Sequence, residues 1–100
     1  MSYDPGALDA ALAAAVGDDP ELVADLRYAF VESAQRQLDL LERSRCDANW
    51  QMTAWRLKGL AASFGVIGLM SLGEEAARSV PGDPVIMRKL KAALASFESA

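Results

Sequence analysis

Histidine, the side chain most often used for acid–base catalysis near neutral pH, is absent from this chain of 100 residues. Cys46 is the only cysteine, in a predicted loop, and Ser63 has no neighbouring base to activate its hydroxyl. The acidic segments 18–21 and 74–75 lack the further ligands that a metal ion requires, so we interpret them as helix-start and solvated charges. We therefore expect no enzymatic activity, no metal site and no cofactor.

The segment 47–64 has a helical pattern with one clear buried side. On a wheel of about 100° per residue with Leu57 at zero, five residues fall within about 60° of Leu57, with Thr53 and Leu60 at the edges. We expect this core stripe to face the protein interior. Its members are Trp50, Ala54, Leu57, Ala61 and Phe64.

The opposite side of this helix is unusually apolar for a surface that should meet solvent. Trp55 lies about 160° from Leu57 on the same wheel. A clustered apolar patch with a polar rim is a common mark of a protein-binding surface. We call these residues the outward face: Met52, Trp55, Gly59, Ala62 and Val66, edged by Gln51, Arg56, Lys58 and Ser63.

Gly59 needs a structural reason, because glycine inside a helix costs about 0.5 to 1 kcal/mol relative to alanine. One reason is the close approach of another backbone to the outward face. The other is that Trp55 lies under an N-terminal helix or a neighbouring loop, and Gly59 makes room for that packing. The sequence leaves both interpretations open.

Residues 54–65, Ala-Trp-Arg-Leu-Lys-Gly-Leu-Ala-Ala-Ser-Phe-Gly, resemble the motif of histidine-containing phosphotransfer (HPt) domains. In that motif His-x-Leu-Lys-Gly leads through small residues to a glycine. Trp55 stands at the position of the phosphoacceptor histidine. The residues that match the motif are Leu57, Lys58, Gly59, Ala61 and Gly65.

This resemblance implies a helical bundle whose acceptor side chain projects towards the acidic pocket of a response-regulator receiver domain. It places Lys58 beside the transfer site and Gly59 where the receiver approaches. Trp55 cannot accept phosphate, because the indole nitrogen is a donor only. The expected function is a pseudo-HPt adaptor of a two-component phosphorelay, which binds a receiver domain or a histidine kinase module without accepting phosphate.

Two other uses of the outward face remain open. The same patch could form a symmetric homodimer that involves no receiver. The chain could also be a relic of a phosphorelay protein, or compete with an intact HPt protein for a shared receiver.

Asp-Pro dipeptides predict the starts of three of the helices that must position these residues. Asp can accept hydrogen bonds from a first helical turn, and Pro lacks the N–H that would otherwise be unpaired there. They stand at Asp4-Pro5, Asp19-Pro20 and Asp83-Pro84.

Five helices follow from the periodicity of the apolar residues, over about 5–16, 20–43, 47–64, the region of Leu69 to Ala76, and 84–97. Asp47 is expected to cap the third helix, and Gly17 and Gly65 to end the first and third. No segment alternates as a half-buried strand would. The predicted fold is all-α, an antiparallel four-helix bundle with a short N-terminal helix packed across one end.

Composition limits the number of domains, the classes of partner and the location that we expect for this protein. A chain of 100 residues with 52% hydrophobic residues suits one domain spanning 1–100. A net charge of -4 argues against nucleic acid as a partner. The most apolar stretch, 7–16, falls far short of the roughly 20 residues of a membrane span. The single cysteine and the absence of a basic leader predict a cytoplasmic protein.

Overall fold

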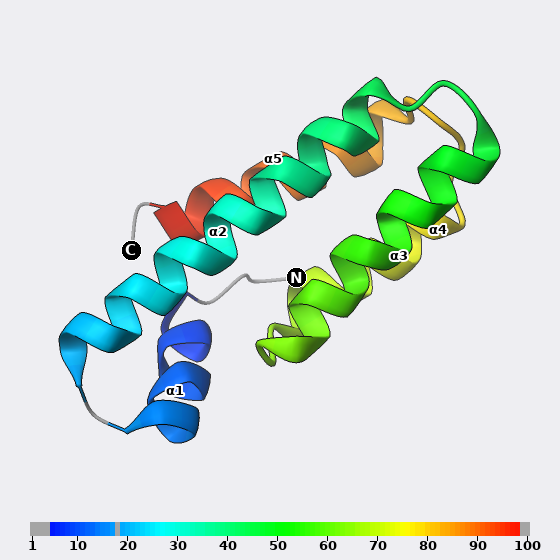
Figure 1. Ribbon diagram of the computed structural model, residues 1–100. Helices are drawn as coiled ribbons and strands as arrows, with labels where there is room; N and C mark the ends of the chain where they lie inside the picture. The colour runs from blue at the N-terminus through cyan, green and yellow to red at the C-terminus, as the bar shows by residue number, and fades with distance from the viewer. Residues whose placement is uncertain (1–4, 18, 99–100) are drawn as a thin grey trace.

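The computed structural model describes residues 5–17 and 19–98, and all regular structure in that part of the chain is α-helical. The all-α prediction is therefore confirmed, and four of the five helices agree with their expected bounds to within one residue. The helices are α1 (Pro5–Val16), α2 (Pro20–Arg43), α3 (Asp47–Ser63), α4 (Ile67–Ala77) and α5 (Pro84–Glu98) (Figure 1).

Two of the Asp-Pro dipeptides begin helices as predicted. Asp19 Oδ1 accepts from the backbone N–H of Glu21 at 3.1 Å, and Asp83 Oδ1 accepts from that of Val85 at 2.9 Å. Each aspartate therefore satisfies a free N–H group of a first helical turn. The third, Asp4, lies outside the described residues.

The prediction that Asp47 caps α3 was wrong. The N-cap residue of α3 is Cys46, and its side chain makes no capping hydrogen bond. Asp47 is instead the first residue of the helix, where a carboxylate interacts favourably with the positive end of the helix dipole. The helix thus begins one residue earlier than a capping aspartate at position 47 would require.

The helices pack around α2, the longest of them. It contacts α1, α3 and α5, while α4 contacts both α3 and α5. Figure 1 shows α2 alongside α5 and α3 alongside α4, with α1 folded against the N-terminal end of α2. Each of α2, α3, α4 and α5 therefore has two of the other three as neighbours.

Large apolar side chains from all five helices meet in the core. The ring of Phe30 on α2 lies 4.9 Å from the ring of Phe64 and 5.9 Å from that of Phe97, measured between centroids. On α2, Phe30, Ala34, Leu38 and Leu41 recur at helical spacing and are buried, whereas Leu22 in the first turn is 40% exposed. An end turn has fewer neighbouring helices than the middle of a helix, which explains this exception.

None of the helices in residues 5–17 and 19–98 combines the length and the apolar character needed to cross a membrane.

Candidate functional site

Helix α3 buries one side completely. The side chains of Trp50, Ala54, Leu57 and Ala61 are fully buried, as the helical wheel predicted. Phe64, just past the helix end, is partly buried against this core. The burial of the core stripe fixes the rotation of α3 about its axis, and so determines which residues face outward.

Trp50 also ties α3 to α4 through a polar contact. Its indole Nε1 donates a buried hydrogen bond of 2.6 Å to the backbone carbonyl of Ala76. That carbonyl belongs to the last turn of α4 and also accepts from the backbone N–H of Ser79 at 3.0 Å. The bond therefore satisfies the buried indole N–H and fixes one end of α4 on α3.

The opposite side of α3 carries the exposed apolar residues of the outward face. Trp55 is 53% exposed and Met52 is 47% exposed, and Gly59 and Ala62 beside them are also exposed. Neither α1 nor a loop among residues 5–17 and 19–98 covers Trp55, so the interpretation that places it beneath the N-terminal helix or a neighbouring loop was wrong. What remains is an exposed tryptophan in the middle of a helix, flanked by small residues.

The assignment of Val66 to the outward face was wrong, because Val66 is only 7% exposed. The helix ends at Ser63, and Gly65 adopts a φ of +71° that turns the chain. The N–H of Val66 then donates to the carbonyl of Ala61 at 2.9 Å, and the N–H of Gly65 donates to that of Ala62 at 3.1 Å. This is the Schellman pattern of helix ends, in which the residue after the glycine packs back onto the helix.

Lys58, which was predicted at the polar edge of the outward face, makes two contacts within the protein. Its Nζ lies 3.1 Å from Oε1 of Glu74 on α4 and 4.4 Å from the centre of the Trp55 ring. An ammonium group at that distance from an indole is attracted by the electron density of the ring. Trp55, Lys58 and Glu74 therefore form one contiguous group that spans α3 and α4.

The acidic pair 74–75 was interpreted as solvated charge, and that interpretation was incomplete. Glu74 pairs with Lys58, and Glu75 pairs with Lys89 on α5 at 2.9 Å. Adjacent carboxylates of α4 thus hold lysines on two different helices. No signal in the sequence could have found these partners, because each ion pair joins helices that only the tertiary fold brings together.

Gly59 of α3 and Gly73 of the neighbouring helix α4 differ in the space around their Cα atoms. A Cβ added to Gly59 would meet no heavy atom within 4 Å outside its own helical turn, so no other described helix or loop approaches it. A Cβ added to Gly73 of α4 would lie 3.0 Å from both Cα and Cβ of Lys58. Gly73 therefore allows the close contact of α3 and α4 that brings Glu74 within reach of Lys58.

The other polar residues at the edge of the outward face differ in the ion pairs and hydrogen bonds that they form. Arg56 is exposed, and within residues 5–17 and 19–98 it forms no ion pair. The hydroxyl of Ser63 donates to the carbonyl of Gly59 at 2.9 Å and is therefore occupied within the helix. Gln51 is exposed. Arg56 is thus the cation of the rim that has no partner in the described structure.

The outward face ends against α1. A cavity of about 470 Å³ lies where α1 meets the C-terminal end of α3, and a Cβ added to Gly65 would lie 3.5 Å from Cβ of Ala11. Ala62 is therefore shared between the outward face and this corner. The cavity is lined by Ala11, Leu12, Ala15, Val16, Leu26, Ala62, Ser63, Phe64 and Gly65.

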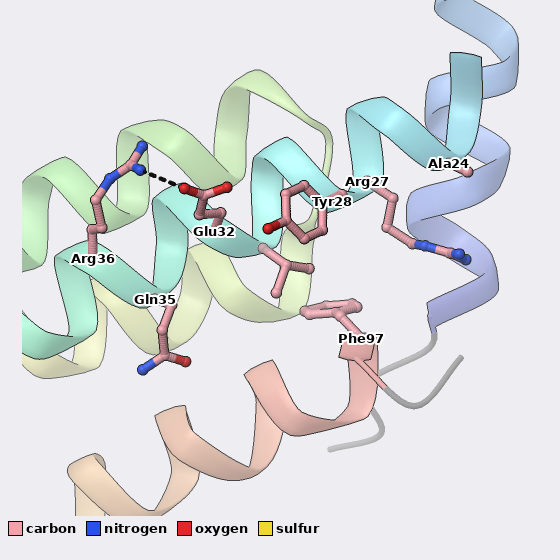
Figure 2. Close-up of a pocket in the computed structure, with 8 residues that line it drawn as sticks. Ala24, Arg27, Tyr28, Glu32, Gln35, Arg36 and Phe97 are labelled. Atoms are coloured by element: carbon pink, nitrogen blue, oxygen red, sulfur yellow. Dashed lines mark hydrogen bonds and ion pairs between the residues drawn. The ribbon is translucent and has the colours of Figure 1, made fainter. Parts of the chain in front are cut away.

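A second hollow, which the sequence reasoning missed, lies between α2 and the C-terminal end of α5 (Figure 2). Its volume is about 640 Å³, and Tyr28 and Phe97 contribute aromatic rings to its wall. The charged groups around it are already engaged, because Arg36 pairs with Glu32 and Arg27 pairs with Asp9, each at 3.0 Å. The full lining is Ala24, Arg27, Tyr28, Val31, Glu32, Gln35, Arg36 and Phe97.

In the part of the chain that the structure describes, no group of three or more His, Cys, Asp or Glu side chains could hold a metal ion. Cys46 is exposed at the start of α3. Comparison with known proteins found no matching family model, no matching curated protein and no matching solved structure.

Proposed function

We propose that this chain is a pseudo-HPt adaptor, which docks a response-regulator receiver domain or a related kinase module through the outward face of α3 and accepts no phosphate. The observation that carries the proposal is the exposure of Trp55, in the middle of α3, at the position where the resemblance places the phosphoacceptor. In this interpretation helices α2 to α5 form the antiparallel four-helix bundle of the HPt family, and α1 packs across one end.

The composition of the outward face supports docking. Gly59 and Ala62 leave little side-chain volume around Trp55, and the space above Gly59 is open. Such a surface lets the backbone of a partner approach α3 closely while Trp55 projects into it. Tryptophan is also among the residue types most enriched at interface hot spots.

The energy available from Trp55 is large enough to support a specific contact. A tryptophan buries about 150 to 250 Å² in all, and about half of that area is still exposed here. At about 25 cal/mol/Å², covering the remainder contributes about 2 to 3 kcal/mol before the costs of association. Exchange of His for Trp at this position would thus favour longer-lived docking while removing the phosphotransfer reaction.

Calorimetric titration of receiver domains from the source organism tests the proposal. We expect at least one receiver to bind the wild-type chain and to lose at least tenfold in affinity with Trp55→Ala, because a central aromatic anchor is removed. The fold should be unchanged, since the side chain is half exposed and forms no part of the core.

Tyr28→Ala is the matched control, because Tyr28 is an aromatic residue on α2 that is 69% exposed. We expect this variant to bind the receiver as the wild type does. Equal affinity of the Trp55→Ala variant and the wild type would contradict the proposal.

The exposed aromatic patch also favours a second candidate, a symmetric homodimer through the same face. Sedimentation velocity over a range of protein concentrations separates the two candidates. A wild-type dimer that Trp55→Ala converts to a monomer supports self-association, whereas a wild-type monomer at all concentrations excludes it.

A further inference from the structure

The two cations beside Trp55 lie on opposite flanks of the outward face. At about 100° per residue, Lys58 falls about 60° to one side of Trp55, and Arg56 falls about 100° to the other. The Lys58 flank borders α4, because a Cβ on Gly73 would lie within 3.0 Å of Lys58 Cα. A partner seated on Trp55 would therefore meet two separate cationic positions, one on each side.

Only one of these positions presents an uncompensated charge. Glu74 Oε1 lies 3.1 Å from Lys58 Nζ, and both side chains are only partly exposed, at 39% and 27%. Arg56 is exposed and has no ion-pair partner within residues 5–17 and 19–98. The charge distribution around Trp55 is therefore asymmetric, although the sequence places a cation on each flank.

Glu74 also influences the position of Lys58. By pairing with its ammonium group, Glu74 holds Nζ 4.4 Å from the centre of the indole ring. One part of the Trp55 ring is thus covered by a side chain of the same protein. The exposed remainder of the ring is the part that a partner can cover.

We infer that Glu74 is a specificity-determining residue of the docking surface, because it neutralises Lys58 and leaves Arg56 as the cation that a partner meets. This inference rests on the proposed docking function and specifies the chemistry of the partner. The docked protein presents an apolar surface to Trp55 and a carboxylate to the Arg56 flank. A carboxylate placed opposite Lys58 would instead compete with Glu74 and be repelled by it.

Quenching of tryptophan fluorescence tests the electrostatic part of this inference without a partner. Trp50 is fully buried, so an aqueous quencher reaches mainly Trp55. Iodide senses the local charge, whereas neutral acrylamide senses exposure alone. Glu74→Gln should raise the ratio of iodide to acrylamide quenching about twofold at low salt, because Lys58 then acts on iodide as an uncompensated charge a few ångströms from the ring.

Glu75→Gln is the matched control, since it makes the same change of net charge at the next residue, which pairs with Lys89. The control should leave the quenching ratio near the wild-type value. A Trp55→Phe variant should remove most of the quenching, which assigns the signal to Trp55. Equal ratios for the Glu74→Gln and Glu75→Gln variants would overturn the inference.

The same variants test specificity against a receiver domain that binds the wild-type chain. Arg56→Gln should weaken binding about three- to tenfold and reduce its dependence on salt, whereas Lys58→Gln should have a smaller effect. An equal or larger loss with Lys58→Gln would overturn the inference. If no receiver binds, the proposed function fails while the quenching result stands; if the quenching ratios do not differ, the inference fails while docking through Trp55 stands.

Discussion

Trp50 and Trp55 lie on the same helix, five residues apart, and differ in almost every physical respect. Trp50 is fully buried and donates its indole N–H to the carbonyl of Ala76. Trp55 is 53% exposed, and the ammonium group of Lys58 lies 4.4 Å from the centre of its ring. One side of α3 therefore stabilises the fold through burial and hydrogen bonding, whereas the other contributes little to stability. That second side is available to bind a partner.

The largest expected effect is the loss of stability in a Trp50→Ala variant. Removal of this side chain leaves a cavity in the core and removes its buried hydrogen bond to Ala76, which together should cost about 3 to 5 kcal/mol. Urea unfolding followed by circular dichroism measures the effect. Trp55→Ala, the comparison, should change the free energy of unfolding by less than about 1 kcal/mol. A similar loss in both variants would contradict the division of α3 into two sides.

The second effect concerns the contact between α3 and α4. In a Gly73→Ala variant the added methyl group would lie 3.0 Å from Lys58 Cα, so the helices must separate. We expect a loss of about 1 to 3 kcal/mol, despite the better helix propensity of alanine. Thermal and urea unfolding should both show it. Unchanged or increased stability would mean that the helices are less closely packed than described.

The smallest expected effect is an increase in stability rather than a loss. A Cβ at Gly59 meets no atom within 4 Å, so Gly59→Ala should stabilise the free protein by about 0.5 to 1 kcal/mol through helix propensity alone. If a partner backbone approaches at this point, the same variant should bind a receiver more weakly. A variant that is more stable but binds equally well would show that Gly59 does not serve docking.

Local pattern was sufficient to predict the helices and the orientation of α3. The spacing of Trp50, Ala54, Leu57 and Ala61 determined which side of α3 packs in the core. It did not decide whether Trp55, on the opposite side, is exposed or covered by another segment, because that depends on where α1 and the loops lie. Val66 was misplaced because a helical wheel has no meaning beyond the glycine that ends the helix. The signal was present, since an apolar residue directly after a terminal glycine commonly packs back onto the helix.

The tertiary contacts of the site were beyond sequence reasoning. Glu74 and Gly73 reach Lys58 only because α4 folds back along α3. The periodicity of either helix does not predict which residues of α4 lie beside which residues of α3. The hollow beside Tyr28 similarly depends on Phe97, which is distant in the sequence. Helix periodicity identifies the faces of single helices, whereas ion pairs and hollows depend on how those faces meet.

The most direct test of the central claim, that α3 presents Trp55 where an HPt domain presents its histidine, is phosphate uptake by a Trp55→His variant. With a phosphorylated receiver domain that binds the wild-type chain, this variant should become labelled, while the wild type stays unlabelled. Tyr28→His, which places a histidine at an exposed site on α2, should also stay unlabelled. Absence of label on a folded Trp55→His variant, or equal labelling of the Tyr28→His variant, would contradict the claim.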